Sequence, residues 1–477
     1  MKNKTKDKPD TIVIKKLKTE NRQSDKAQTN KNAVFFRKHI AAFILVISAL
    51  CLSGVLLAFL HFNNKSTPAS ADAHTAESSE VLSETASEAA GTNNDETAST
   101  STDKDNSLSG GTAADASTTY TKSEPVSINI MMIGDMLIHE GVYNSGKLTD
   151  GSYNFDHLFK NILNDINNSD IRIVNQETIL GGTGLGLSGY PCFNSPYEIG
   201  DAEAKAGFNV ILHATNHSLD KGVKGINNCT NYWKTKHPEM AVLGLFNNPD
   251  DAGKIYVYEK NDFKVAILNY TYGTNGIEIP SSMPYCVNIL NETKIRADVT
   301  RAKELADMVI VCPHWGTEYV YQPDSNQKYW TNLFLSLGVD VVIGSHPHVL
   351  EPVEMLTGSD GHQMLVYYSL GNFVSNQSEM PRMIGGMADI TLIKESDGSH
   401  RIKSYSLTPV VTHKKFGHAE ITTYKLQDYN NQLAQDNAIR KDEGCSSFSY
   451  EYCVSLCKKI LGNEFNVSTC SLNVNLN

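Results

Sequence analysis

Residues 126–135, VSINIMMIGD, form a strand-like apolar run that ends in an acidic side chain, Asp135. Further downstream, similar runs end in polar residues with the potential to bind metal or transfer protons. These are Glu177 in IVNQE, Asn216 and His217 in ATNH, His314 in VCPHWG, and His346 and His348 in GSHPH. In an open α/β sheet, the loops that leave the carboxyl ends of parallel strands converge on one crevice. The recurrence therefore predicts a metal site.

From Val126 onward, short apolar runs alternate with longer amphipathic ones, which is typical of βαβ units. The predicted fold class is α/β, with mostly parallel β-sheets flanked by helices. Strands are predicted at 126–133, 171–175, 209–213, 263–270, 308–312, 339–343 and 364–369, and helices at 198–206, 221–234, 293–306 and 326–337. Residues 386–394 and 400–411 alternate as an antiparallel pair around Ser396-Asp397-Gly398.

An unbroken apolar run, Ile40–Leu60, precedes this domain. At about 1.5 Å per helical residue, it spans roughly the 30 Å hydrocarbon core of a bilayer. A cleaved signal peptide is the competing interpretation, because small residues at 69–73 permit cleavage. Signal h-regions are usually only about 7 to 15 residues long, so we expect an uncleaved transmembrane helix at 39–62.

The N-terminal tail, 1–38, holds twelve Lys or Arg and four Asp or Glu, a net charge of +8. The positive-inside rule places this tail in the cytoplasm and the main domain outside the cell, on a single-pass protein of the cell membrane. Since the whole chain carries −11, the remainder carries −19. A basic nucleic-acid-binding surface is therefore excluded for the exported part.

Two segments flank the predicted domain, which we place at 126–412. Residues 63–125 are rich in Ser, Thr, Ala and acidic residues, so they bury too little apolar surface to fold and are predicted to be a disordered linker. The C-terminal extension, 413–477, contains Cys445, Cys453, Cys457 and Cys470. Disulfides, with three pairings open, and a zinc knuckle are the two interpretations of these cysteines, although no ligand spacing supports zinc.

A mixture of carboxylate, amide and imidazole ligands favours a divalent transition metal such as Mn, Zn or Fe. Two ions about 3.5 to 4 Å apart need a bridging carboxylate and several ligands each. The strand ends supply enough ligands for this, and His217 is then available as a proton donor. Each residue also has a simpler interpretation, since Asp135 can cap a turn and Asn216 can cap a helix. Asp220 either orients His217 or interacts with a helix dipole.

The motifs GDMLIHEGVY, NQE, ATNHSLDKG, HWGTEY, GSHPHVLEPVE and YSLGNF, in this order, resemble the capsule-biosynthesis CapA (PGA_cap) family, which is associated with poly-γ-glutamate. The resemblance covers about 126–411. That family is similar in fold to calcineurin-like metallophosphoesterases, which implies an α/β sandwich with metal ligands on strand-end loops. In the phosphoesterase pattern a ligand His follows the first Asp by two residues. Here that position is Leu137, and His139 is the nearest histidine.

Together, the residues and the resemblance give a candidate site. The predicted metal ligands are Asp135, His139, Glu177, Asn216, His314, His346 and His348, and the predicted catalytic residues are His217 and Asp220. A glycine-rich stretch, 181–189, lacks the spacing of a nucleotide-binding loop and is interpreted as a flap. The predicted substrate contacts are Tyr190, Phe193 and Asn194 after that flap, Trp315 and Glu318 in HWGTEY, and Asn372 in SLGNF.

Three functional hypotheses follow. The first, implied by the resemblance, is a membrane-anchored extracellular component of capsule or poly-γ-glutamate synthesis or export, working with other capsule-synthesis subunits. The second is a metal-dependent phosphoester hydrolase with two ions that acts on cell-envelope substrates. The third is a non-catalytic module that binds the polymer. The substrate is accordingly an anionic polymer or a phosphoester, and fold analogy alone does not choose between them.

Overall fold

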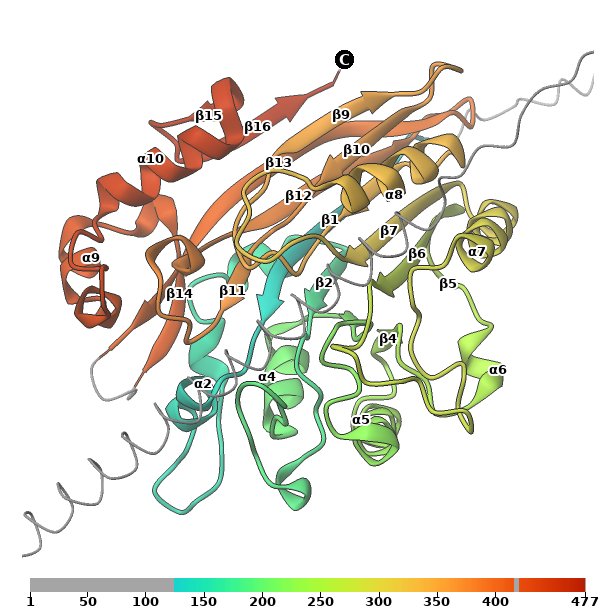
Figure 1. The fold of residues 1–477 in the computed structure, drawn as a ribbon. Helices are drawn as coiled ribbons and strands as arrows, with labels where there is room; N and C mark the ends of the chain where they lie inside the picture. Colours follow the sequence, from blue (N-terminus) through green and yellow to red (C-terminus); the bar gives the residue numbers. More distant parts are fainter. Residues whose placement is uncertain (1–123, 416–419, 477) are drawn as a thin grey trace, which may run out of the picture. The chain divides into compact units, whose positions relative to one another are not determined.

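The computed structural model describes residues 124–415 and 420–476 of the chain (Figure 1). The predicted basic tail and transmembrane segment, and all of the predicted linker up to residue 123, lie outside the described residues. In the part that is described, every helix is too short or too polar to cross a membrane.

Two β-sheets form the centre of the fold (Figure 1). The larger runs in the order β15 (Phe465–Asn466), β16 (Ser471–Asn475), β13 (His400–Lys414), β12 (Ile384–Lys394), β1 (Val126–Met136), β2 (Ile171–Asn175), β3 (Val210–Leu212) and β4 (Ala241–Leu243). In addition, β11 (Asn372–Val374) pairs with β1 and β14 (Ile421–Lys425) with β13. The smaller runs in the order β5 (Tyr256–Lys260), β6 (Phe263–Thr271), β7 (Met308–His314), β8 (Val341–Ile343), β10 (Gln363–Tyr367) and β9 (Val353–Thr357).

The sheets are mixed, which corrects the prediction that they are mostly parallel. Parallel pairing joins β1, β2, β3 and β4 in one sheet and β6, β7, β8 and β10 in the other. Antiparallel pairing joins β1 to β12, β12 to β13 and β5 to β6, among others. Apolar periodicity marks a strand but carries no information about the direction of its neighbour. Of the antiparallel pairs, the sequence therefore predicted only the β12–β13 hairpin, at 386–394 and 400–411, and the structure confirms it.

Alternate residues of each central strand face different layers. In β1, Ile130 and Met132 lie in the core between the two sheets, whereas Met131 and Ile133 lie in the core under α4 (Glu198–Ala206) and α5 (Gly222–Lys236). In β7, Ile310 faces the intersheet core and the neighbouring residues face α7 (Glu292–Leu305) and α8 (Ser325–Ser336). Since side chains alternate across a strand, two-sided burial requires the continuous apolar runs of the sequence.

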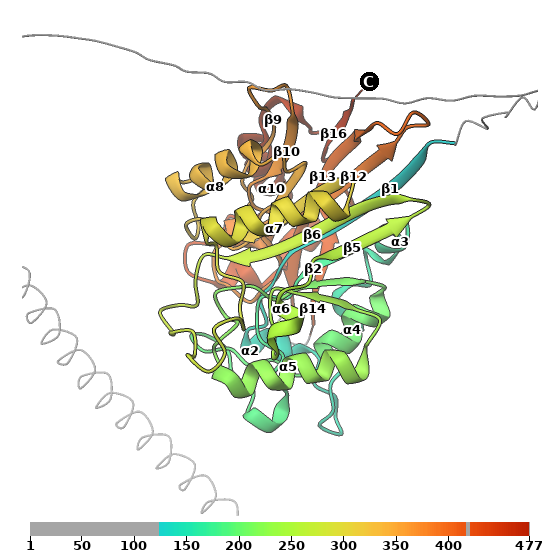
Figure 2. The same ribbon diagram turned by 90° about the vertical axis from the view of Figure 1, so that its right-hand side faces the viewer.

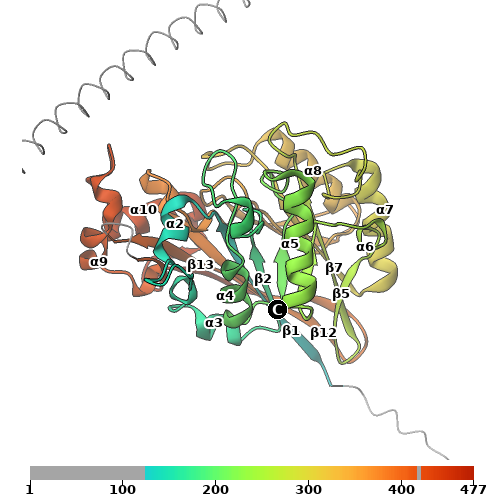
Figure 3. The same ribbon diagram turned by 90° about the horizontal axis from the view of Figure 1, so that it is seen from below.

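Most of the helices cover the outer faces of the two sheets. In Figure 2, α7 lies along β6, and the two elements are in contact. Figure 3 shows α4 and α5 together with α2 (Glu140–Ser145) and α3 (Leu163–Asn167) on the face seen from below. The other α-helices of the described residues are α6 (Pro249–Ala252), α9 (Asn431–Asp436) and α10 (Tyr450–Leu461). The buried residues of α9 and α10 belong to the same hydrophobic core as the residues between the two sheets. The result is an α/β sandwich in which the helices of each outer layer pack on one sheet.

The start of α8 is fixed by a reciprocal cap. Asp324 accepts a hydrogen bond from the backbone N–H of Gln327, and the Gln327 side chain accepts one from the backbone N–H of Asp324. Such a capping box satisfies two of the donors that a helix start leaves free. It therefore fixes where the chain turns into α8 after leaving β7, whose last residue is His314.

The C-terminal extension belongs to the same sheet as the rest of the domain. β13 continues to Lys414, so the boundary predicted after residue 412 falls inside a strand. Beyond it, β14 and β16 both pair with β13. All eight cysteines among the described residues are unpaired thiols. Cys453 and Cys457 are buried in the hydrophobic core on α10.

Candidate metal centre

Most of the predicted ligands meet at the carboxyl ends of the central parallel strands. Asp135 is near the end of β1, His314 ends β7, and Glu177 follows β2 by two residues. The loops after β3 and β8 supply the remaining polar residues, Asn216, His217, His346 and His348. All seven side chains are buried. Strand ends from distant parts of the chain thus come together, as expected for parallel strands.

Glu177 is at the centre of this cluster. Its Oε1 lies 3.6 Å from His348 Nε2, 3.7 Å from His314 Nε2 and 4.0 Å from His217 Nε2. The possible ligand atoms of Glu177, His346 and His348 all lie within 4.8 Å of one another. One carboxylate surrounded by imidazole nitrogens at these distances can share a cation with them.

Asp135 contacts His348 from the other side. The Nδ1 of His348 donates to Asp135 Oδ2 at 3.0 Å, and the backbone N–H of His346 donates to Asp135 Oδ1 at 3.3 Å. Metal-binding histidines are commonly held by a carboxylate on their other ring nitrogen, which fixes the tautomer. Asp135 orients His348 in this way and leaves the Nε2 of His348 directed at Glu177. A direct Asp135 contact to the metal stays a prediction.

The backbone of the GSHPH segment is shaped to present both histidines. His346 has a φ of 101° and His348 a φ of 59°, values that side-chain-bearing residues rarely adopt. Just before them, a Cβ on Gly344 would lie 2.0 Å from the carbonyl oxygen of Tyr368. Strain of this kind costs about 1–3 kcal/mol per residue and is concentrated at functional sites. The tight backbone packing at Gly344 holds the strained loop in place.

The electrostatics of the cluster fit a cation. Both oxygens of Glu177 and the Nδ1 of His346 are buried without a hydrogen-bond partner. Burial lowers the pKa of His314 and of His346, so both imidazoles are neutral and able to donate a lone pair. Burial also raises the pKa of Glu177 well above its ordinary value, against the opposing effect of His348. Unpaired buried acceptors facing neutral imidazoles are the groups that a divalent metal satisfies.

His217 sits between two carboxylates. Its Nδ1 donates to Asp220 Oδ2 at 2.7 Å, and its Nε2 faces Glu177. Asp220 also accepts a hydrogen bond from the backbone N–H of Phe193. The structure thus brings together the predicted pair, with Asp220 in place to orient His217. Asn216 lies next to them, where its Oδ1 is 2.9 Å from His314 Nε2.

His139 lies close enough to His348 and His217 that, besides burial, their charges lower its pKa, and its role as a metal ligand stays a prediction. Its Nδ1 contacts the backbone carbonyl of Leu137 at 3.2 Å and the backbone N–H of Asn376 at 3.3 Å. The ring of Phe193 packs edge-on against His139, with centroids 5.2 Å apart, and also against His217 at 4.6 Å. Burial lowers the pKa of His139 to about 4. Phe193, predicted as a substrate contact, therefore forms a buried aromatic contact between the two histidines.

The other predicted substrate contacts occupy different environments. Tyr190 is 80% exposed and Glu318 is also exposed, so both are accessible to a ligand. Asn194 is buried and donates to the backbone carbonyls at 182 and 186 within the flap. Trp315 is 1% exposed in the core, and its indole N–H donates to the carbonyl of Tyr368. The position of Trp315 is that of a packing residue.

Asn372, also predicted as a substrate contact, contacts instead the GSHPH segment at residues 344–348, which we call the metal-centre loop. It starts β11, and its Oδ1 lies 3.1 Å from His348 Nδ1. Its Nδ2 donates to the backbone carbonyl of Arg382 at 3.0 Å. The side chain is fully buried. Asn372 therefore holds His348 together with Asp135.

Sequence reasoning missed four residues around the cluster. Asn175 donates to Asp135 Oδ1 at 2.9 Å, and it lies two residues before Glu177, on the same face of the strand end. That spacing was a usable signal. The Tyr272 ring packs at 4.7 Å from His346, Asn275 accepts from Asn216, and Tyr319 packs at 6.0 Å from His348. Tyr272 and Asn275 come from a loop without a periodic pattern, so their sequence carries no comparable signal. Tyr319 ends the HWGTEY motif, but it was not singled out there.

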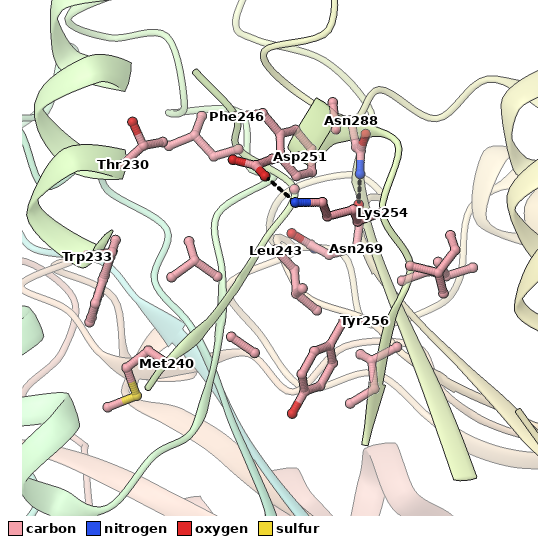
Figure 4. Close-up of a pocket in the computed structure, with 18 of the residues that line it drawn as sticks. Thr230, Trp233, Met240, Leu243, Phe246, Asp251, Lys254, Tyr256, Asn269 and Asn288 are labelled. Atoms are coloured by element: carbon pink, nitrogen blue, oxygen red, sulfur yellow. Dashed lines mark hydrogen bonds and ion pairs between the residues drawn. The ribbon is translucent and has the colours of Figure 1, made fainter. Parts of the chain in front are cut away.

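A separate cavity of about 550 Å³ opens between α5, β4 and β5, lined by Trp233, Met240, Leu243, Phe246 and Tyr256 among others (Figure 4). It shares no lining residue with the metal cluster. Lysines at its rim are already paired, Lys234 and Lys254 both with Asp251. This hollow thus lies apart from the candidate metal ligands, which are packed tightly against one another.

Comparison with known proteins assigns the family. Residues 129–377 match the family model described as bacterial capsule synthesis protein PGA_cap, which is more than half of the chain. The chain belongs to this family. It is also similar to the PGA biosynthesis protein CapA of Bacillus subtilis (strain 168), with 30% identity over 209 residues, covering 43% of this chain and 52% of that protein. The capsule biosynthesis protein CapA of Bacillus anthracis is 30% identical over 181 residues, covering 37% and 42%.

This PGA_cap protein therefore matches about half the length of those relatives. Among solved structures, it is similar to an NAD nucleotidase of Haemophilus influenzae, with 13% identity and a TM-score of 0.39, covering 60% of this chain and 56% of the other. A 5′-nucleotidase precursor of Thermus thermophilus gives 13% identity and a TM-score of 0.37, with coverage of 60% and 54%. At these TM-scores the likeness carries no argument about function.

Proposed function

We propose that this PGA_cap protein is a metal-dependent phosphoester hydrolase that serves the synthesis or export of an anionic capsule polymer such as poly-γ-glutamate. The single observation that carries the reaction is the buried Glu177, which has no hydrogen-bond partner and faces the Nε2 atoms of His217, His314 and His348. Family membership supports the biological process.

Glu177, His346 and His348 would hold the metal, with His314 and Asn216 beside them. Mn, Zn or Fe, as one ion or two, would supply Lewis-acid polarisation of a phosphoryl oxygen. Among the chain's own residues, Asp135 orients His348. A mixed carboxylate and imidazole set suits these metals better than Mg or Ca.

His217 would hold and deliver a proton. Its Nδ1 is bound to Asp220, so the Nε2 is the atom directed into the cluster. A carboxylate on one ring nitrogen sets the orientation of the imidazole, as expected for a general acid. Phe193 packs on one side of the ring and, being apolar, shields it from water. The geometry therefore fits protonation of a leaving oxygen.

A non-catalytic polymer-binding module is the weaker candidate, because binding alone needs no Asp220–His217 pair directed at a metal cluster.

We further propose that the protein is anchored by its apolar segment at 39–62, with the domain outside the cell, near other capsule-synthesis subunits. The net charge of +8 on residues 1–38 supports this orientation. Externally added protease should then degrade the domain in intact spheroplasts, and protection of the domain would contradict the orientation.

The hydrolase is tested with purified full-length protein loaded with Mn or Zn. Wild type should hydrolyse bis(p-nitrophenyl) phosphate or p-nitrophenyl phosphate. His217→Ala should retain its metal and lose about 100-fold or more in kcat, the usual contribution of general acid catalysis. His400→Ala, which changes an exposed histidine on the β12–β13 hairpin, is the matched control. A metal-loaded wild type that cleaves neither compound would contradict the proposal.

A further inference from the structure

A stacked arginine lies beside the metal cluster and has no role in it. The guanidinium carbon of Arg382 is 3.4 Å from the ring centroid of Tyr319, and that ring is 6.0 Å from the ring of His348. Arg382 is therefore one aromatic ring away from a predicted metal ligand. Besides His348, the charged side chains that influence the pKa of Glu177 include Asp135, Glu318 and Asp220, all acidic.

Backbone contacts tie both members of this stack to the metal-centre loop. The N–H of Tyr319 donates to the carbonyl of Pro347 at 2.8 Å, between the two histidines of GSHPH. The carbonyl of Arg382 accepts from Asn372, the residue that also contacts His348. Tyr319 has a φ of 67°, and its hydroxyl accepts from Gln377. The stack is consequently built at a fixed position relative to His348.

The guanidinium is not saturated by its present partners. Its Nε is buried with no hydrogen-bond partner. One Nη2 bond reaches Glu379 at 2.7 Å, but the Glu379 side chain is 58% exposed. An ion pair that is open to solvent at its Glu379 side contributes little to stability, so a ligand can displace Glu379. The Tyr319 face meanwhile holds the planar fork of donors that matches carboxylate and phosphate.

We propose that Arg382, stacked on Tyr319, is a subsite for a second oxyanion of the substrate, next to the group held at the metal cluster. This inference rests on the proposed function and deepens it, because it restricts the substrate to molecules with at least two anionic groups in a row. A carboxylate of a glutamate polymer and a phosphate of a polyphosphate ester share that chemistry. Arg382 positions such a substrate and takes no part in bond breaking.

The subsite is tested by calorimetric titration of Mn-loaded full-length protein with three probes: inorganic phosphate, sodium tripolyphosphate and a γ-linked glutamate oligomer. Charge-assisted hydrogen bonds contribute enough that Arg382→Gln should weaken at least one of the two multi-anion probes by roughly tenfold or more. Inorganic phosphate, with a single anionic centre, should bind equally well to wild type and variant. Loss with the oligomer alone assigns a carboxylate ligand, and loss with tripolyphosphate alone assigns a phosphate.

Three further variants separate binding from structural support. Glu379→Gln frees the guanidinium and should tighten the same probe by about two- to fivefold. Arg382→Lys keeps the charge without the fork and should give an intermediate affinity. Arg296→Gln removes an exposed arginine of a comparable pair with Glu292 on α7 and should change nothing.

The inference is overturned if wild type binds neither multi-anion probe, if Arg382→Gln binds both as wild type does, or if Glu379→Gln weakens binding as much as Arg382→Gln. Metal content and the far-ultraviolet circular dichroism of each variant show whether it is folded. If Arg382→Gln does not fold, the affinity of Arg382→Lys for the multi-anion probes tests the subsite in its place. If wild type cleaves no phosphoester but its probe binding still depends on Arg382, the proposed hydrolase is wrong and the subsite stands. If wild type is active but its probe binding does not depend on Arg382, the hydrolase stands and the subsite is wrong.

Discussion

Replacing Glu177 with Gln should abolish metal-dependent stabilisation without destabilising the metal-free protein. A ligand that binds only the folded state at about 100 times its Kd stabilises it by about 2.7 kcal/mol. With an unfolding entropy of about 2.1 cal/mol/K per residue over roughly 350 folded residues, Mn should raise the Tm of wild type by about 4 °C. The amide of Glu177→Gln cannot provide a charged ligand, so its shift should fall below about 1 °C.

In the presence of a chelator the same variant should be at least as stable as wild type. Both Glu177 oxygens are buried without partners, and burial raises the pKa of this carboxyl, so the ionised form is a cost in the metal-free fold. Glu203 on α4 is the matched control, because it too is fully buried with two unpartnered oxygens and a pKa raised by burial. It lies outside the ligand group, so Glu203→Gln should keep the shift of about 4 °C.

Scanning calorimetry with and without Mn measures all three proteins. The reasoning is refuted if Glu177→Gln keeps the wild-type shift, or if Glu203→Gln loses it to the same extent.

Three further predictions concern pH and packing. Burial alone would lower the pKa of His348, but the negative charges of Glu177 and Asp135 outweigh burial, and the pKa rises to about 9. Metal binding must expel this proton, so Mn affinity measured by chelator competition should rise up to about tenfold per pH unit from pH 7 to 9. An Mn affinity that does not change with pH would contradict His348 as a ligand. Without metal, protonated His348 contributes stability to the fold that is fully present below about pH 6.5 and is lost as the pH rises towards 9. Burial raises the pKa of Glu351 to about 8, so the fold favours its neutral form and loses stability as the pH rises from about 4.5 to 8. Glu351→Gln should therefore raise the Tm at pH 8 and not at pH 4. An equal change in Tm at both pH values would contradict the raised pKa of Glu351. Trp315→Phe leaves the carbonyl of Tyr368 without its hydrogen-bond donor, so the free energy of unfolding in urea should fall by about 1–3 kcal/mol while KM stays unchanged. A raised KM would instead support Trp315 as a substrate contact.

The strands and helices could be predicted because their periodicity is dictated locally. The predicted helix at 198–206 coincides with α4, and the predicted strand at 171–175 coincides with β2. Sheet direction and membership depend on partners far along the chain, so the antiparallel β1–β12 pairing and the insertion of the C-terminal β16 beside β13 were not predicted. The cysteine tail was open between two interpretations, and the structure places Cys453 and Cys457 in a hydrophobic core.

The site was predictable as far as it follows strands. Glu177, His314, His346 and His348 converge because parallel strands end at one edge. His139 was included only to fill a position in a family pattern. Its Nδ1 accepts from the backbone N–H of Asn376, and its role as a ligand stays a prediction. Arg382 lies in a short 3-10 segment, Met380–Met383, without periodicity, and only the folded chain brings it against Tyr319.

The central claim is that Glu177, His346 and His348 hold a catalytic metal, and metal content tests it most directly. Full-length wild type and His346→Ala should be equilibrated with Mn or Zn, dialysed against metal-free buffer and analysed by mass spectrometry of the elements. The account predicts at least one transition metal ion per chain in wild type and clearly less than one in His346→Ala, with Glu203→Gln matching wild type. Substoichiometric metal in wild type, or equal metal in wild type and His346→Ala, would contradict it.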